Sequence, residues 1–126
     1  MKDFKGYFII PTEPEILYKG LTTEITIQLW SGAPAQMEEK VDTEFSLWDG
    51  SIVGKNLAFE PNKMIQQEWY FGENETPSIV TLKLHEHKQG TSLEVRHTNI
   101  PDEAYEDIVD GWKEEYVQSL IHFYAE

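Results

Sequence analysis

Histidines are the side chains of this 126-residue sequence best suited to chemistry near neutral pH. His85 and His87 lie two residues apart in a segment that alternates like a β-strand, so both imidazoles leave the same face and could share a metal ion. Alternation places them on the wet face, opposite Leu82 and Leu84, and the sequence offers no third or fourth ligand. We therefore expect solvated histidines, with no metal site and no cofactor.

His97 follows Leu93 and Val95 in alternation and is predicted to point inward. An inward histidine beside aromatic rings could transfer protons. No acid or nucleophile converges on it in the sequence, so a hydrogen-bonded core histidine is the favoured interpretation. The chain has no Gly-rich phosphate loop, Ser-His-Asp order or zinc-protease motif. We expect no catalytic residue and no enzymatic activity.

Aromatic side chains could line an apolar ligand cavity, which would need a volume of roughly 300 Å³ or more. The candidate lining residues are Phe45, Gln67, Trp69, Phe71, His97, Tyr105, Trp112 and Tyr116. Gln67 and His97 are included as partners for the polar tips of tyrosine and tryptophan, which need hydrogen bonds when buried. The alternative is that the rings simply fill a close-packed core.

The charge balance restricts the partners of this chain. It has 23 acidic and 10 basic residues, a net charge of −13, and Arg96 is its only arginine. Nucleic acids and anionic membranes are poor partners, because binding them requires lysine and arginine. A basic protein surface could meet the acidic stretches, although solubility alone explains such charge. These stretches are Glu38-Glu39, 73–75 and 102–110.

Targeting signals and cysteines are absent from the sequence. The N-terminus lacks the apolar run of a signal peptide, and no stretch approaches the roughly 20 apolar residues of a membrane span. The chain has no cysteine, which fits a reducing compartment. We expect a cytoplasmic protein in which residues 1–126 form a single domain.

The N-terminal third predicts a strand followed by two short helices. Residues 4–10 are β-branched and aromatic, as in a strand. Thr12 is placed to cap a first helix that ends near Gly20. A second helix is predicted from the threonine pair at 22–23 to about Trp30. The buried side of the first helix is predicted to be Ile16, Leu17 and Leu21.

The middle of the chain alternates with a period of two and predicts antiparallel strands with one wet face. Asp49-Gly50 favours a type I′ hairpin, and Gly54 is a predicted bulge or bend. The predicted strands are 41–47, 51–60, 64–71, 78–87 and 91–98.

The C-terminal segment changes to a helical period. About 24 residues from Pro101 predict a helix of roughly 36 Å, long enough to cross a sheet. Gly111 is expected to let this helix approach a neighbour closely. Its apolar stripe is predicted to be Tyr105, Val109, Trp112, Tyr116, Leu120 and Phe123. The fold class is therefore α+β: a curved antiparallel sheet of six to seven strands around a long C-terminal helix, with two short helices after the first strand.

This order resembles the helix-grip fold of the START-like (SRPBCC) superfamily. Motifs in register extend the likeness to one of its families. They are Ala33-Pro34-Ala35, Phe45, 49–54, Leu57, Pro61, Trp69, 78–82, 91–93, His97, Ile100-Pro101 and Gly111-Trp112. From about Phe8 onward the chain is similar to the C-terminal domain of the activator of the ninety-kilodalton heat-shock chaperone ATPase and to its stand-alone bacterial homologues.

The resemblance implies a non-enzymatic binding module with a heat-shock chaperone as partner and a stress-response co-chaperone role. Within the superfamily, the alternatives are a carrier or sensor of a small hydrophobic ligand held between sheet and helix, and, ranked last, a cyclase-like enzyme. Many relatives have a glycine pair where this chain has Thr43-Glu44, so that strand is expected to start differently. The activator's N-terminal domain makes its main chaperone contact and has no counterpart here, so strong stimulation is not expected.

Overall fold

A computed structural model of the chain describes residues 1–72 and 76–125. Within these residues six strands form one antiparallel sheet in the order β1-β6-β5-β4-β3-β2. The strands are β1 (Lys2–Ile10), β2 (Glu44–Leu47), β3 (Ile52–Glu60), β4 (Met64–Trp69), β5 (Ser78–His87) and β6 (Gly90–Ile100). Residues 73–75, one of the acidic stretches, lie outside the described residues.

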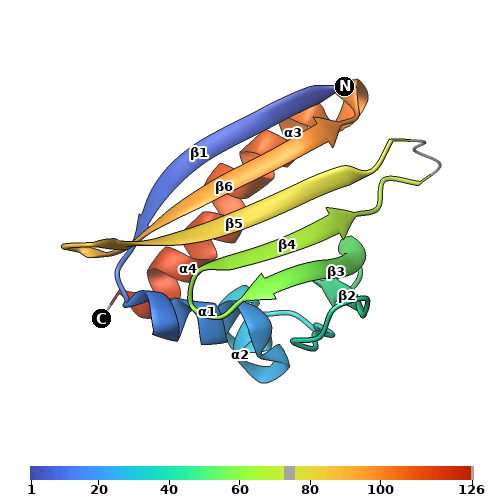
Figure 1. Cartoon of the computed structure of the whole chain (residues 1–126). Helices are drawn as coiled ribbons and strands as arrows, with labels where there is room; N and C mark the ends of the chain where they lie inside the picture. The colour runs from blue at the N-terminus through green and yellow to red at the C-terminus, as the bar shows by residue number, and fades with distance from the viewer. Residues whose placement is uncertain (73–75, 126) are drawn as a thin grey trace.

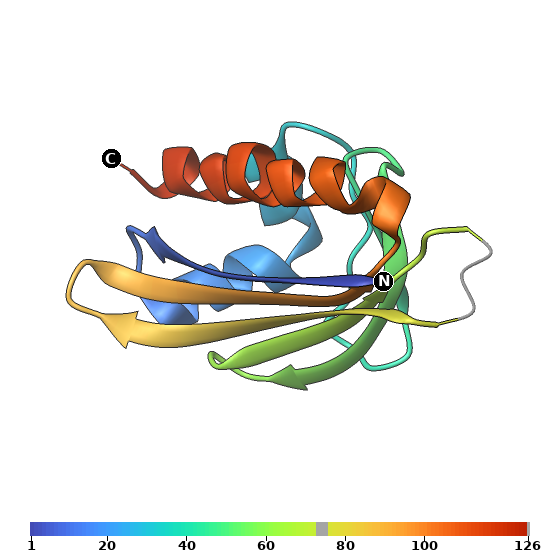
Figure 2. The same cartoon turned by 90° about the horizontal axis from the view of Figure 1, so that it is seen from above.

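Helices occupy one side of the sheet. The two short helices are α1 (Pro14–Thr22) and α2 (Glu24–Ser31). The C-terminal helix is continuous and consists of η1 (Asp102–Ala104), α3 (Tyr105–Gly111), η2 (Trp112–Tyr116) and α4 (Val117–Tyr124). Figures 1 and 2 show this long helix crossing one face of the curved sheet in a separate layer, with α1 and α2 on the same side. The predicted α+β helix-grip architecture is confirmed. None of the helices in the described ranges is long and apolar enough to cross a membrane.

The core lies between the inward face of the sheet and the C-terminal helix. The predicted alternation is confirmed, because the inward side chains of the central strands are buried. They are Ile65, Gln67, Trp69, Val80, Leu82, Leu84, Leu93, Val95 and His97. From the helix, Trp112, Tyr116, Val117 and Leu120 pack against them.

The first short helix differs from its prediction at both ends. Its N-cap is Glu13, whereas the Thr12 carbonyl accepts a hydrogen bond from the Thr91 hydroxyl at 2.7 Å. The helix continues past Gly20, whose carbonyl accepts a hydrogen bond from the Trp30 indole at 2.8 Å. The predicted burial of Ile16 is wrong, since that side chain is 46% exposed and the opposite side of α1 faces the core. A Cβ atom at Gly20 would collide with the Tyr124 hydroxyl, so this glycine serves close packing and does not end the helix.

Strand β2 is shorter than predicted. The predicted strand started at Val41, but β2 begins at Glu44. Asp42 has a φ of +68°, which is not an extended conformation, and the side chain of Val41 is exposed. The next turn is as predicted: Asp49 and Gly50 both have positive φ angles, and the Ser51 N–H donates to the Trp48 carbonyl at 3.1 Å.

Gly54 is not the predicted bulge of strand β3. The register shift lies farther along, between Asn56 and Ala58. A Cβ atom at Gly54 would collide with the carbonyl oxygen of Glu68 and with the ring of Phe45. The glycine is required there because the neighbouring strand and this ring occupy the space of a side chain.

A π-helical turn, Trp112–Tyr116, interrupts the C-terminal helix. It adds a residue to the turn and rotates everything that follows. Val117 is therefore fully buried, whereas Phe123, predicted to lie in the apolar stripe, is 38% exposed. The expectation of close packing at Gly111 is also wrong, because a Cβ there would meet no atom within 4 Å.

The two glycines predict opposite effects of the same substitution. Gly54→Ala should destabilise the protein by about 2 kcal/mol, because the new methyl group overlaps backbone. Gly111→Ala should stabilise it by about 0.5–1 kcal/mol, since this residue is helical (φ −59°, ψ −42°) and the methyl group enters open space. Urea unfolding of the three proteins measures both changes. Equal free energies of unfolding for the two variants would contradict the packing at Gly54.

Candidate functional site

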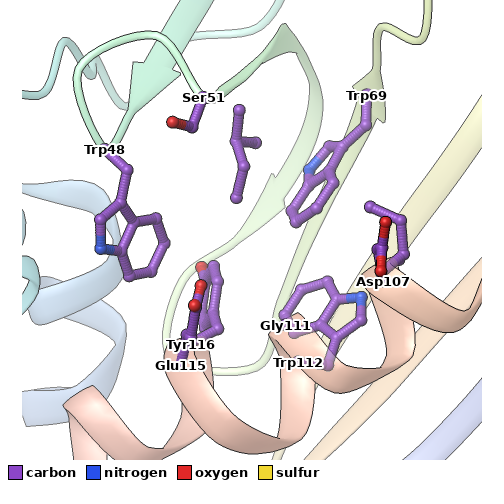
Figure 3. A pocket seen from close by; sticks show the side chains of 10 residues that line it. Trp48, Ser51, Trp69, Asp107, Gly111, Trp112, Glu115 and Tyr116 are labelled. Atoms are coloured by element: carbon purple, nitrogen blue, oxygen red, sulfur yellow. The ribbon is translucent and has the colours of Figure 1, made fainter. Parts of the chain in front are cut away.

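An aromatic pocket opens between the β2–β3 turn, the end of β4 and the middle of the C-terminal helix. Its volume is about 220 Å³. Figure 3 shows Trp48 on one side, Trp69 and Asp107 on the other, and Tyr116 and Trp112 on the helix between them. The lining residues are Trp48, Ser51, Ile52, Trp69, Asp107, Ile108, Gly111, Trp112, Glu115 and Tyr116. This volume is smaller than the roughly 300 Å³ expected for a drug-sized ligand, so only a compact group fits.

The rings around the pocket contact one another across three elements. Trp69 on β4 stacks on Trp112 of the helix, with centroids 5.0 Å apart and an interplanar angle of 20°. Tyr116 lies 4.6 Å from Trp112 and 5.6 Å from Trp48, between these two rings. Trp30 of α2, which does not line the pocket, packs edge-on against Trp48, with ring centroids 5.6 Å apart. Contacts between the rings thus hold the walls of the pocket in place.

The indole of Trp69 is tied to a buried polar chain. Its Nε1 donates to Gln67 Oε1 at 3.0 Å, and Gln67 Nε2 donates to Asn56 Oδ1 at 3.1 Å. Asn56, which is fully buried, donates in turn to the Glu38 carbonyl at 3.2 Å. This series of hydrogen bonds connects β4 and β3 to the segment before β2, so it fixes the sheet side of the pocket.

The indole of Trp112 is tied to His97. Trp112 Nε1 donates to His97 Nδ1 at 3.0 Å, so this nitrogen carries no proton. His97 Nε2 lies 2.9 Å from the Ser78 hydroxyl, which donates to the Thr98 carbonyl at 3.1 Å. The Nε2–H tautomer is therefore the one that satisfies every bond of the network.

The environment of His97 keeps the imidazole neutral. Burial lowers the pKa of His97 from 6.5 to about 4, and the charge of Asp3 opposes this shift only in part. Both ring nitrogens are engaged and the residue is 0% exposed. A general base needs a free nitrogen within reach of its substrate. His97 has no free ring nitrogen and is out of reach of a substrate. Its role in this structure is to hold Trp112 in place.

Three of the predicted cavity residues, Trp69, Trp112 and Tyr116, line the pocket. Gln67 and His97 lie behind it, and the prediction that they are partners of buried polar tips is confirmed by their bonds to the two indoles.

The other three predicted residues lie elsewhere. Phe45 is buried in the core, and its ring borders Gly54. Phe71 is partly buried, 6.0 Å from the ring of His97. The Tyr105 hydroxyl donates to the Asp3 carbonyl at 3.2 Å, at the start of the helix.

Sequence reasoning did not find the rest of the lining. Trp48 has a φ of +49°, rare for a bulky residue, and no sequence pattern indicates it. Asp107 and Glu115 flank the apolar stripe on the wet side of the helix. Their spacing of eight residues places them on one helix face, which is a signal that the sequence did contain. Both are exposed carboxylates, so the pocket has aromatic walls and an acidic rim.

The predicted histidine pair lies on the outer face of the sheet. His85 Nε2 lies 2.9 Å from Glu94 Oε1, and this hydrogen bond holds the pKa of Glu94 below its usual value. Arg96 Nε lies 3.6 Å from the other oxygen of the same carboxylate. Within residues 1–72 and 76–125, no group of three or more histidine or acidic side chains is placed to hold a metal ion.

His97 makes stability depend on pH. Its folded-state pKa lies below the ordinary value, so this contribution is fully present above pH 6.5 and falls as the pH drops toward 4. The loss should total about 3 kcal/mol, at no more than about 1.4 kcal/mol per pH unit. His97→Asn keeps an oxygen that can accept from Trp112 but cannot titrate in this range. Urea unfolding at several pH values should show a shallower decline for this variant, and parallel curves would contradict the assignment.

Comparisons with known proteins agree with this architecture. The model of the family described as "Activator of Hsp90 ATPase homolog 1-like protein" matches residues 11–123. The chain is 29% identical over 111 residues to the mouse "Activator of 90 kDa heat shock protein ATPase homolog 1", which covers 86% of this chain and 33% of the mouse protein. The chain thus spans about a third of the length of the curated relatives that it matches.

Solved structures show the same fold. An HSP90 activator from Plasmodium falciparum is 26% identical, with a TM-score of 0.84 over 94% of this chain and 92% of that one. The Aha1 dimer from Colwellia psychrerythraea is 17% identical, with a TM-score of 0.78 over 98% and 93% of the two chains. Because the sequence identity to the Colwellia psychrerythraea protein is only 17%, this similarity shows a shared fold and nothing more.

Proposed function

We propose a function that follows from family membership: the chain belongs to the family of activator of Hsp90 ATPase homolog 1-like proteins, which matches residues 11–123. The proposed function is that of a non-enzymatic binding module that contacts a chaperone of the 90-kDa heat-shock class. The observation that carries it is the match to proteins named as activators of this chaperone. We infer that residues 1–126 act as one cytoplasmic domain, because sheet and helices share one core and the chain lacks cysteine.

The geometry of the core supports binding over catalysis. An enzyme needs positioned acid–base groups with access to substrate. His97, the inward histidine, is fully buried and bonded at both nitrogens. A protein of this kind acts through its surface.

An exposed apolar surface on the helices is a candidate contact. The α2–α4 patch consists of Ile25, Leu29 and Phe123, which are 69%, 65% and 38% exposed. Leu29 and Phe123 border one groove, and Glu114 lies on its edge. Exposed apolar side chains with a polar rim are typical of protein interfaces. The net charge of −13 favours a partner surface that is basic around an apolar centre.

The chaperone proposal predicts a salt-sensitive complex. Binding of the chain to a purified chaperone of this class, measured by calorimetry, should weaken several-fold between about 50 and about 300 mM salt. The ATPase rate of the chaperone, measured in the same samples, tests whether binding also activates it. No complex at low salt would overturn the proposal.

The α2–α4 patch predicts which substitutions weaken that complex. Leu29→Ser with Phe123→Ser should reduce affinity about tenfold or more, because both side chains are exposed and free to contact a partner. The matched control is Val41→Ser, an exposed apolar residue before β2, which should leave affinity unchanged. Equal losses in both variants would exclude the patch as the contact.

The aromatic pocket supports a second candidate function, that of a carrier or sensor of a small ligand. Its 220 Å³ would admit a compact, largely apolar molecule between the β2–β3 turn and the helix. A ligand of the native state raises stability by about 2.7 kcal/mol at a hundredfold excess over its Kd.

Substitutions at Gly111 test this candidate. Gly111 borders the pocket and a side chain there starts in open space, so Gly111→Leu should occupy the entrance. A metabolite that raises the Tm of the wild type should also raise that of Gly111→Ala but not that of Gly111→Leu. A Tm increase that survives in Gly111→Leu would place the ligand elsewhere.

A further inference from the structure

We propose that the aromatic pocket is a binding site for an organic cation, an alkylammonium or guanidinium head group. The inference rests on the second proposed function, since it requires a ligand in this pocket, and it names the chemical class of that ligand. It does not depend on the α2–α4 patch, because the groove beside that patch shares no lining residue with this pocket.

The walls of the pocket have the chemistry that attracts cations. Trp48, Trp69, Trp112 and Tyr116 surround one opening, with Trp48 facing the Trp69–Trp112 stack across it (Figure 3). The π-faces of tryptophan and tyrosine carry negative charge density, and tryptophan binds cations best. A neutral apolar ligand would gain from these rings only through burial, whereas a cation gains an electrostatic attraction as well.

The rim supplies the opposite charge. Asp107 and Glu115 border the pocket on one face of the helix and are both exposed. Apolar walls of low dielectric strengthen the attraction between these carboxylates and a cation between them. The net charge of −13 raises the local concentration of cations around the whole protein. An anionic ligand would meet repulsion at the same rim.

Two local departures from ordinary backbone structure converge on this pocket. The π-helical turn Trp112–Tyr116 forms its floor, and such turns occur often at functional sites. Trp48 keeps its φ of +49° while the neighbouring Asp49 N–H donates to the Pro34 carbonyl at 2.9 Å. Gly111 has ordinary helical angles, but it places a weak helix former beside the pocket where no neighbour requires a glycine. Unfavourable local conformations that cluster at one cavity indicate that its shape is used.

The size of the pocket restricts the cation. A volume of 220 Å³ is below that of sites for drug-sized molecules. A lipid tail or polycyclic ligand would not fit, whereas a trimethylammonium or guanidinium group would. The same chemistry occurs in free small amines and in arginine or methylated lysine side chains of a partner protein.

A matched pair of probes tests the inference. Choline and 3,3-dimethylbutan-1-ol have nearly the same shape, but only choline is charged. Titrations followed by tryptophan fluorescence and by the indole N–H resonances should give saturable choline binding, about tenfold or more tighter than the neutral alcohol. N-acetylarginine N-methylamide, titrated in parallel, distinguishes a partner's side chain from a free amine by which of the two cations binds more tightly.

Rim variants separate the pocket from the general negative charge of the protein. The double variant Asp107→Asn with Glu115→Gln should weaken choline binding at least about fivefold. The control is Asp110→Asn, an exposed acid on the same helix away from the pocket, which should bind as the wild type does. Equal affinity for choline and the neutral alcohol would overturn the cation inference while leaving the pocket a ligand site. If choline, the neutral alcohol and the arginine derivative all fail to bind, both the cation inference and the ligand site are wrong. Equal losses of choline affinity in the rim and control variants would show that choline is attracted by the net charge of the protein and not by the pocket.

Discussion

Two buried indole N–H groups are the constraint on which this structure depends. Trp69 and Trp112 stack at the centre of the interface between sheet and helix, where water cannot satisfy their donors. Each donor therefore needs a protein acceptor, and each acceptor must itself be held. Gln67 and His97 fill these roles through bonds that continue to Asn56 and Ser78. Because these partners belong to four different strands, the hydrogen bonds that satisfy two rings also fix the position of the helix on the sheet.

Those parts of the fold that obey local rules could be predicted from the sequence. A period of two indicates which side chains of a strand face inward, and the inward position of His97 followed from it. The need of a buried indole for an acceptor then predicts Gln67 and His97 as its partners. The hairpin at Asp49-Gly50 is equally local, since only a few residue types favour two successive positive φ angles.

The remainder depends on tertiary contacts that no short pattern encodes. The π-helical turn has helix-forming residues, yet it moves Val117 into the core and Phe123 out of it. Trp48 adopts its positive φ inside a loop whose neighbours are Trp30 and Tyr116, residues distant in sequence. A stripe of aromatic residues predicts contact with a sheet but not the place where the sheet ends and a pocket begins. For this reason the sequence pattern predicts one cavity for Phe45, Tyr105 and Trp112, although the three side chains occupy separate environments.

The placement of the central histidine decides what this scaffold can do. Structural neighbours with low sequence identity share the grip of sheet on helix, and a shared fold does not fix a function. In this chain the imidazole of His97 accepts a hydrogen bond from the Trp112 indole. Proton transfer by this histidine would first require breaking that bond, which holds the helix on the sheet. Exposed positions at the rim of the pocket and on the outer helix surfaces can vary without disturbing this bond. Both surfaces are accessible to a partner, so the proposed binding functions require no change in the core.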